Sequence, residues 1–178
     1  MDADSGTDYY TSNWGTNYTK IDKNGNKIWT YTQALGTEGT NGNGISTDAS
    51  FAYVLGNGGD QIDVLDKATG ILNHIIKLPG TITFRGTLVV ANGHIYIAGS
   101  AKWSNNNTNN WIHQLDMNGN YENSISTNAV NPKNASFDGE TIWLSEGKNI
   151  ITGIKISEGN AYVAKAVINL TVTDASNN

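Results

Sequence analysis

The chain has 178 residues, of which 38% are hydrophobic, and this is enough for one domain with a sizeable core. Its net charge is −5 at pH 7 and Arg85 is its only arginine, so it lacks the basic stripe with which proteins bind nucleic acids or anionic membranes. The absence of cysteine excludes disulfides, thiolate zinc sites and cysteine nucleophiles.

No apolar run approaches the roughly 18 residues that span a bilayer. The first ten residues, MDADSGTDYY, have neither the basic nor the apolar region of a signal peptide. Charged residues make up only 15% of the chain, while Asn, Thr, Ser and Gly are abundant. Such a composition disfavours long surface helices and is typical of exported β-rich proteins. We therefore expect an extracellular or periplasmic protein.

Four segments share a pattern in which two strands with alternating polarity flank a turn. In chain order they are NYTKIDKNGNKIWTYT (17–32), QIDVLDKATGILNHIIKL (61–78), WIHQLDMNGNYENSIS (111–126) and ITGIKISEGNAYVAKAVINL (151–170). Each turn has a glycine where a positive φ is needed, namely Gly25, Gly70, Gly119 and Gly159. These segments predict four β-hairpins.

The hairpins repeat at a regular distance along the chain. The residues that close their first strands, Asp22, Asp66, Asp116 and Ser157, are 44, 50 and 41 positions apart. A further strand pair precedes three of the hairpins, at 44–56, 86–99 and 134–146. Repeats of about 40 to 50 residues with four strands each are typical of propeller blades. We predict an all-β fold in which residues 1–178 form a single β-propeller domain of about four four-stranded antiparallel blades.

The end of the chain resembles an earlier part of it, because TVTDAS (171–176) is close to ISTDAS (45–50). Residues 2–13 have only the later part of a strand pair, so we expect the C-terminal strand to complete the first blade. Open sheet edges invite aggregation, which favours closure of the ring. Either one chain closes on itself, or two chains share an eight-bladed ring as a homodimer. A fragment of a longer propeller is the third alternative.

Two stretches carry a resemblance to a known group of repeats. STDASFAYVLGNGGDQIDVLDKATGILNHIIKL (46–78) resembles a blade of the YVTN/NHL/quinoprotein-like β-propeller repeats, and IDKNGNKIWTY (21–31) is similar to the quinoprotein variant. The resemblance implies the propeller fold and no particular activity, because such propellers include enzymes, sensors and binding proteins. Since the quinone- and metal-binding residues of the group have no matching positions here, we expect no cofactor.

The side chains that ligate metals do not form a recognised pattern. His74, His94 and His113 lack metal-site spacing, which favours structural or surface roles. The aspartates at 22, 66 and 116 recur at turn positions, where an aspartate binds backbone amides. The segment DADSGTD (2–8), with Asp2, Asp4 and Asp8, is a weak calcium candidate. We therefore expect no metal site.

Tryptophans divide into two groups. Trp29, Trp111 and Trp143 lie within predicted strands and are expected to pack between blades. Trp14 and Trp103 lie in loops that join the second and third strands of a blade. Those loops and the connections between blades emerge on one face of a propeller, which we call the loop-rich face. The opposite face receives short turns and is called the turn face.

The loop-rich face is the predicted ligand-binding surface. The residues expected to bind are Trp14, Trp103, Asn105, Asn106 and Asn107, with indole rings for stacking and amides for hydroxyl groups. Indole rings and amides can bind a glycan or an extracellular protein. Alternatively, the two tryptophans fold back to cap the blades and bind neither. The sequence thus predicts a non-enzymatic binding module.

Two other functions remain open at this stage. A propeller glycoside hydrolase or lyase would use carboxylates around the central channel, such as Asp48, Asp138 or Asp174, with two acids facing each other within about 10 Å. A structural assembly module would act through strand exchange alone and would have no ligand-sized pocket.

Overall fold

The computed structural model describes residues 2–4, 8–12, 16–33, 44–55, 60–80, 82–101, 111–127, 134–145, 150–157 and 160–169. Every regular element within these ranges is a β-strand, which confirms the all-β prediction. The described part of the chain contains no helix of the length and apolarity that crossing a bilayer requires.

The described residues contain sixteen strands in four antiparallel sheets, and each sheet consists of four strands that follow one another in the sequence. Blade 1 consists of β1 (Asp2–Asp4), β2 (Asp8–Ser12), β3 (Asn17–Asp22) and β4 (Lys27–Thr32). Blade 2 consists of β5 (Ile45–Thr47), β6 (Phe51–Leu55), β7 (Gln61–Asp66) and β8 (Leu72–Lys77). Blade 3 consists of β9 (Ile82–Ala91), β10 (His94–Ala101), β11 (Trp111–Asp116) and β12 (Tyr121–Ser126). Blade 4 consists of β13 (Asn134–Phe137), β14 (Thr141–Ser145), β15 (Ile150–Ser157) and β16 (Asn160–Asn169). The predicted four-stranded blades are confirmed.

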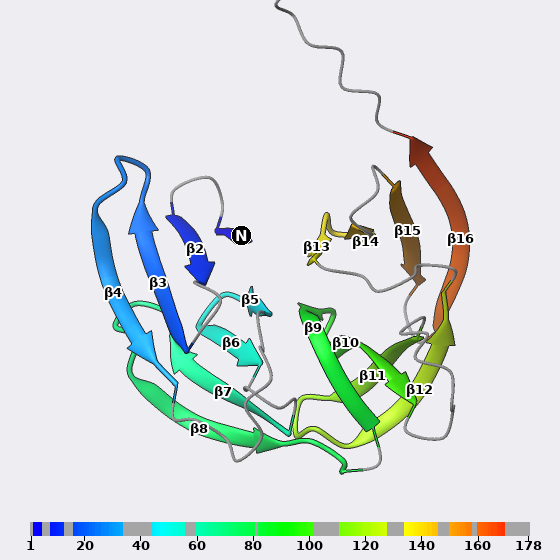
Figure 1. The fold of residues 1–178 in the computed structure, drawn as a ribbon, viewed down its shortest axis with the longest axis horizontal. Coiled ribbons are helices and arrows are strands. Elements are labelled where there is room, and N and C mark those ends of the chain that lie inside the picture. The colour runs from blue at the N-terminus through cyan, green and yellow to red at the C-terminus, as the bar shows by residue number, and fades with distance from the viewer. Residues whose placement is uncertain are drawn as a thin grey trace, which may run out of the picture.

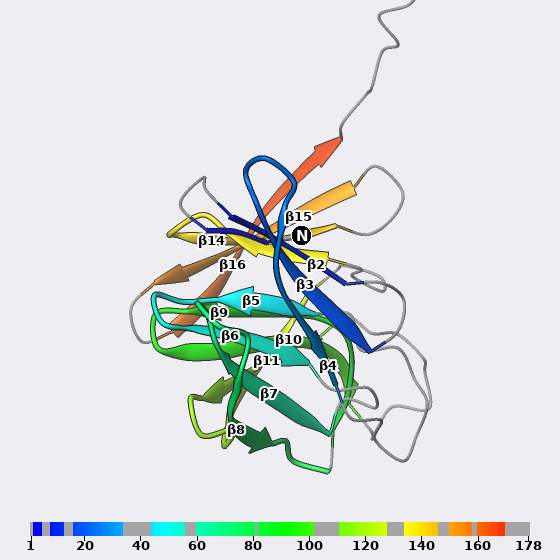
Figure 2. The same ribbon diagram turned by 90° about the vertical axis from the view of Figure 1, so that its left-hand side faces the viewer.

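The blades follow one another around a common centre and form an open arc, with blades 1 and 4 at its two ends (Figure 1). The first strand of each blade lies toward the centre and contacts the first strand of the next blade, while the fourth strand lies outermost. Seen from the side of blades 1 and 2, the strands of successive blades are stacked with a twist (Figure 2).

The innermost position of blade 1 differs from the expectation. We expected the C-terminal strand, within residues 167–176, to supply this position, but β1 occupies it, with Asp2 paired opposite Tyr10 and Asp4 opposite Asp8. Only three residues separate β1 from β2 in the sequence, so the two strands are neighbours in the chain as well as in the sheet. Residues 171–176 lie outside the described residues.

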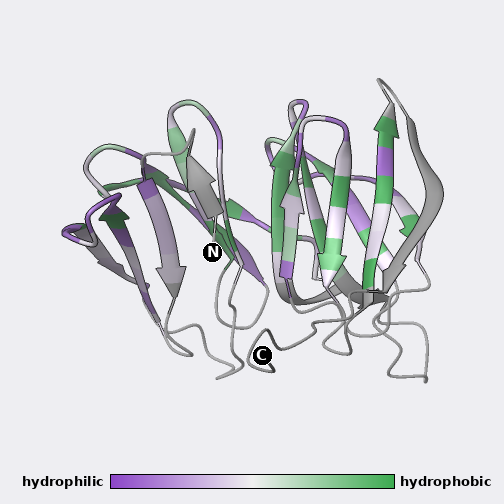
Figure 3. Ribbon diagram, turned by 90° about the horizontal axis from the view of Figure 1, so that it is seen from above, coloured by the Kyte–Doolittle hydropathy of each residue, from purple (hydrophilic) through white to green (hydrophobic). Residues whose placement is uncertain are grey.

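Three apolar clusters hold the blades together, one at each boundary between neighbours. The cluster between blades 1 and 2 contains Tyr10, Tyr18, Trp29, Ile45, Ala52, Val54 and Leu65. The cluster between blades 2 and 3 is centred on Tyr53, Leu55, Val64, Ile95, Ile97 and Leu115. The cluster between blades 3 and 4 includes Val89, Tyr96, Ile112, Ile142, Leu144 and Ile154. Figure 3 shows the corresponding apolar segments of the strands in green.

The middle blades are buried on both faces and the terminal blades on one. β7 and β11, the third strands of blades 2 and 3, are each buried at four consecutive positions. In β3 and β14, which belong to blades 1 and 4, buried and half-buried residues alternate. Because side chains alternate between the two faces of a sheet, each terminal blade buries only the face toward its neighbour.

Polar contacts add to the boundary between blades 1 and 2. The Asp63 carboxylate, which is 2% exposed, accepts hydrogen bonds from the Tyr31 hydroxyl at 2.8 Å and from Gln33 Nε2 at 2.9 Å. The Lys67 carbonyl accepts from Lys20 Nζ and from Trp29 Nε1, both at 3.1 Å. Trp29 therefore packs between blades, as the sequence predicts, and it is also anchored by its indole nitrogen.

Candidate functional site

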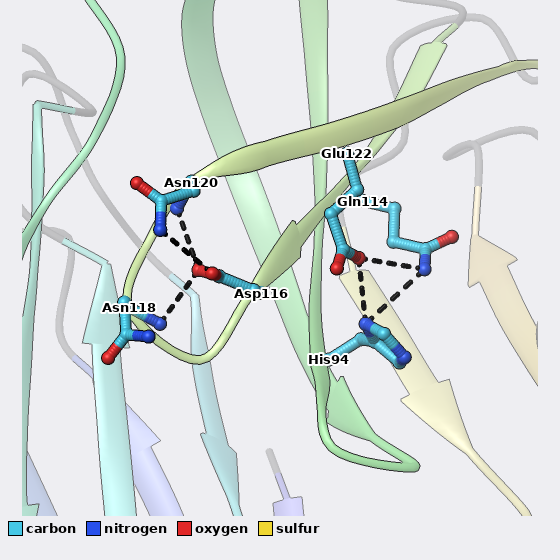
Figure 4. Close-up of polar contacts among 6 residues, drawn as sticks. All are labelled: His94, Gln114, Asp116, Asn118, Asn120 and Glu122. Carbon is cyan, nitrogen blue, oxygen red and sulfur yellow. Dashed lines mark hydrogen bonds and ion pairs between the residues drawn. The ribbon is translucent and has the colours of Figure 1, made fainter.

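Aspartates close the turns between the third and fourth strands of blades 1 to 3. Figure 4 shows the turn of blade 3, in which Asp116 Oδ1 accepts hydrogen bonds from the backbone amides of Asn118 (2.9 Å) and Asn120 (2.8 Å), while Oδ2 accepts from the Asn120 side chain (2.8 Å). Asp22 has the same arrangement in blade 1, and Asp66 binds the amides of Ala68 and Thr69 in blade 2. The predicted role of these aspartates in turns agrees with these contacts.

These hydrogen bonds make the turns sensitive to acid. The side chain of Asn26 lowers the pKa of Asp22, the side chain of Asn120 lowers that of Asp116, and Thr69 lowers that of Asp66. A carboxyl with a lowered folded-state pKa stabilises the fold above its unfolded-state pKa, and this stabilisation is lost as the pH falls through the lower folded-state value.

We therefore expect the urea midpoint of the protein to fall steeply below about pH 4, the ordinary range of an aspartate. A variant with Asp22→Asn, Asp66→Asn and Asp116→Asn should be less stable at pH 7 and should show a shallower slope between pH 4 and pH 2.5. Asp60→Asn, at an exposed position, is the control and should retain the steep slope. Equal slopes for the parent and the triple variant would contradict the assignment.

The turns between first and second strands use another aspartate arrangement. Asp48 accepts from the amides of Ser50 and Phe51 through one oxygen and from the Tyr53 hydroxyl through the other, each at 2.7 Å. Asp138 likewise accepts from the amides of Glu140 and Thr141, and its second oxygen accepts from Trp143 Nε1 at 2.6 Å. Both oxygens of each carboxylate are therefore engaged in the turn.

The pKa of both carboxyls lies below the ordinary value. Burial alone would raise the pKa of Asp48, but the hydrogen bonds from Tyr53 and the turn amides outweigh it. For Asp138 the largest cause is the hydrogen bond from Trp143. A general acid needs a raised pKa, so these contacts fit turn stabilisation better than the acid role in the hydrolase hypothesis. Asp174 lies outside the described residues.

A pocket of about 270 Å³ lies at the centre of the arc, where the first strands of blades 2, 3 and 4 converge. It is lined by residues 45–49, by Val89 and Val90, by residues 135–137 and by Lys67. Because the first strands end at the turn face, the pocket lies toward that end of the axis. Its wall combines apolar side chains and the Phe137 ring with the hydroxyls of serines and a threonine.

Two polar side chains of this pocket form hydrogen bonds within the structure. Lys67, which is 9% exposed, donates from Nζ to the Asp48 carbonyl at 2.5 Å. Ser46 Oγ accepts from the Val90 amide at 3.0 Å and so links the first strands of blades 2 and 3. Lys67 and Ser46 are thus engaged in internal hydrogen bonds that link the strands around the pocket.

A second polar cluster crosses three strands of blade 3 (Figure 4). His94 Nδ1 lies 2.8 Å from Glu122 Oε2, and Gln114 Nε2 donates to the same oxygen at 3.0 Å. The side chains of His94 and Glu122 are about one-third exposed, at 31% and 35%. The cluster therefore joins β10, β11 and β12 at the surface of blade 3, and its ion pair forms when His94 is protonated.

The remaining histidines and the calcium candidate have separate surroundings. His74 lies exposed on the outer strand β8, and burial lowers the pKa of His113 on β11 to about 4. Asp8 forms an ion pair with Lys20 at 3.0 Å. Among the described residues, no group of three or more histidine, aspartate or glutamate side chains is placed to hold a metal ion.

The predicted ligand residues Trp14, Trp103, Asn105, Asn106 and Asn107 lie outside the described residues, so they stay predictions. β2 and β10, which precede Trp14 and Trp103, are both second strands and therefore run toward the loop-rich face.

Sequence reasoning missed two buried residues, Asp63 and Lys67. For Asp63 a signal existed, since it is a polar residue within the otherwise apolar strand QIDVLD.

Comparison with known proteins gives matches at the level of structure. No protein family and no curated protein matches the sequence. Solved structures that are similar include a protein of unknown function from Bacteroides caccae (13% identity, TM-score 0.62), hydrazine synthase of Kuenenia stuttgartiensis (20%, 0.60) and glutaminyl cyclase of Myxococcus xanthus (11%, 0.59). The latter two are β-propeller proteins. The chain has the β-propeller fold.

The matches cover 94%, 92% and 78% of this propeller chain and 59%, 47% and 57% of the similar structures. The chain therefore spans about half to three-fifths of their length. At these identities the likeness concerns the fold and carries no activity from one protein to another.

Proposed function

We propose that this propeller is a non-enzymatic binding module that recognises a glycan through its loop-rich face. The proposal rests on one observation, the hydrogen bonding of the aspartates on the turn face. There the carboxylates of Asp48, Asp116 and Asp138 are all engaged in their own turns. The turn face thus offers rigid, internally satisfied turns, and recognition falls to the opposite end of the blades.

The chemistry of the loop-rich face supports a sugar ligand. Trp14 and Trp103 are flanked by Asn, Thr and Ser in SNWGTN (12–17) and AKWSNNNTNN (101–110). Indole rings stack on the C–H faces of sugars, and side-chain amides both donate to and accept from hydroxyl groups. A glycan ligand also agrees with the extracellular or periplasmic location that the composition favours.

Trp103→Ala is expected to abolish binding on a glycan array without lowering the melting temperature, because the indole would be a stacking platform and not part of the core. Tyr121→Ala is the matched control. It removes a ring that is 49% exposed at the start of β12, beside the turn face, and should leave glycan binding intact.

Two outcomes would contradict the proposal. A large fall in the melting temperature of Trp103→Ala would assign this side chain to the capping of the blades. An unaltered chain that binds no glycan but captures a protein through Trp103 would show a protein-recognition module, since tryptophan is also frequent in protein interfaces.

A further inference from the structure

The two ends of the arc expose faces that match the interior boundaries between blades. Each second strand has an aromatic residue in its third position, namely Tyr10, Tyr53, Tyr96 and Trp143. The first three are 0–3% exposed and pack against the following blade. Trp143 points away from blade 3, because its neighbours Ile142 and Leu144 form the cluster with that blade. Within the described residues, no blade follows blade 4 to cover Trp143.

Trp143 is held in a fixed position although its face is open. Its Nε1 donates to Asp138, and its ring lies so close to β15 that a Cβ on Gly153 would be 2.8 Å from it. Tyr53 has the same bond to Asp48 and is buried against blade 3. The open face of blade 4 thus shares the anchored aromatic ring of a covered face, and it also has Lys155, which pairs with Glu140 at its exposed margin.

The open face of blade 1 is suited to receive such a blade. It presents Tyr9, Thr11, Thr19 and Ile21, which are half-buried, uncharged, and aromatic or β-branched. The corresponding faces of blades 3 and 4 present Ile95 with Ile97 and Ile142 with Leu144. Solvated sheet faces are normally polar, whereas this face includes Tyr9 and Ile21.

The glycines in the turns between third and fourth strands also indicate that one side of blade 1 is uncovered. A Cβ on Gly119 of blade 3 would lie 2.5 Å from Ile76 and 2.8 Å from the Lys77 carbonyl of blade 2. A Cβ on Gly70 of blade 2 would lie 2.6 Å from the Trp29 ring of blade 1. A Cβ on the equivalent Gly25 of blade 1 meets nothing within 4 Å. The space before Gly25 is where the outer strand of a preceding blade would lie.

We infer that a second copy of this chain covers both open faces, so that two arcs close one eight-bladed ring. A two-fold axis makes both contacts identical, with blade 4 of each copy packed on blade 1 of the other. The matched regions make up 59% and 47% of two similar structures, so two copies of this chain supply a comparable length. The second copy also completes the wall of the central pocket, which the first strands of blades 2 to 4 line on one side. This inference is independent of the ligand on the loop-rich face.

The test is the mass of the full chain in solution, measured by light scattering after gel filtration. The ring predicts twice the chain mass of 19.1 kDa, constant over a tenfold dilution. Trp143→Lys and Thr19→Lys place a charge on the blade 4 face and the blade 1 face respectively, and each should shift the mass to that of one chain. Ile71→Lys, at a position 68% exposed in a blade 2 turn, is the control and should keep the double mass.

A mixing experiment separates loss of the interface from loss of the fold. A ring with one copy of each variant retains one unaltered contact, between blade 4 of the Thr19→Lys chain and blade 1 of the Trp143→Lys chain. Mixing the two should therefore restore a part of the double-mass species. A single-chain mass for the unaltered protein, or an open polymer, would overturn the inference.

Discussion

Asp63→Ala is expected to lower the free energy of unfolding by about 1.5–3 kcal/mol, since hydrogen bonds to a charged group are strong and the buried Gln33 side chain loses one of its acceptors. The carboxylate is 2% exposed and accepts hydrogen bonds from Tyr31, Gln33 and Gln61. Two of these donors belong to the end of blade 1, so the loss falls on the boundary between blades 1 and 2. Urea unfolding followed by tryptophan fluorescence measures it.

Two controls make this result specific. Asp60→Ala removes an exposed carboxylate nearby and should change stability by no more than about 0.5 kcal/mol.

Asp63→Asn retains the shape of the side chain without its charge. Burial and then the Asp63 carboxylate raise the pKa of Tyr31, so in Asp63→Asn the tyrosine should ionise at lower pH in an ultraviolet titration. An unchanged tyrosine titration would mean that Asp63 does not act on Tyr31.

Gly119→Ala should cost more than Gly25→Ala by about 1–3 kcal/mol, the usual effect of overpacking. The two turns, DKNGN and DMNGN, differ at one residue, and the glycines have φ values of 84° and 86°. The cost of a methyl group at positive φ, about 1–2 kcal/mol, is therefore common to both variants. Only Gly119 adds a clash with the outer strand of the preceding blade.

The comparison requires a single chain, because the inferred second copy would cover Gly25. Both alanine variants are therefore made in the Trp143→Lys background, and urea unfolding is measured at one protein concentration. Equal losses of stability would show that the turns do not pack against the preceding blade. In the unaltered background, the closed ring predicts that the two losses become similar.

Features set by local contacts could be predicted from the sequence. The hairpins, the turn glycines and the aspartates at 22, 66 and 116 depend on residues two to four positions away, and such contacts leave a repeated pattern. Repetition at intervals of 41 to 50 residues then indicated blades, and the four sheets confirm it.

Features set by contacts between blades could not be predicted in the same way. Asp63 meets its donors Tyr31 and Gln33 across 32 and 30 residues, and nothing in QIDVLD names these partners. Trp29 and Trp143 look alike in the sequence, yet one faces a neighbouring blade and the other the open end of the arc. The strand at the centre of blade 1 was missed because three residues, DAD, are too few to show alternation.

The construction of every sheet from four consecutive strands has a consequence for folding. Each blade can form from its own stretch of chain, and stability then passes from one blade to the next only through the shared clusters, as in other repeat proteins. Blades 2 and 3, flanked on both sides, form the last unit to open. Unfolding of a single arc therefore begins at blades 1 and 4, and a neighbour that covers these ends slows the opening of the whole chain.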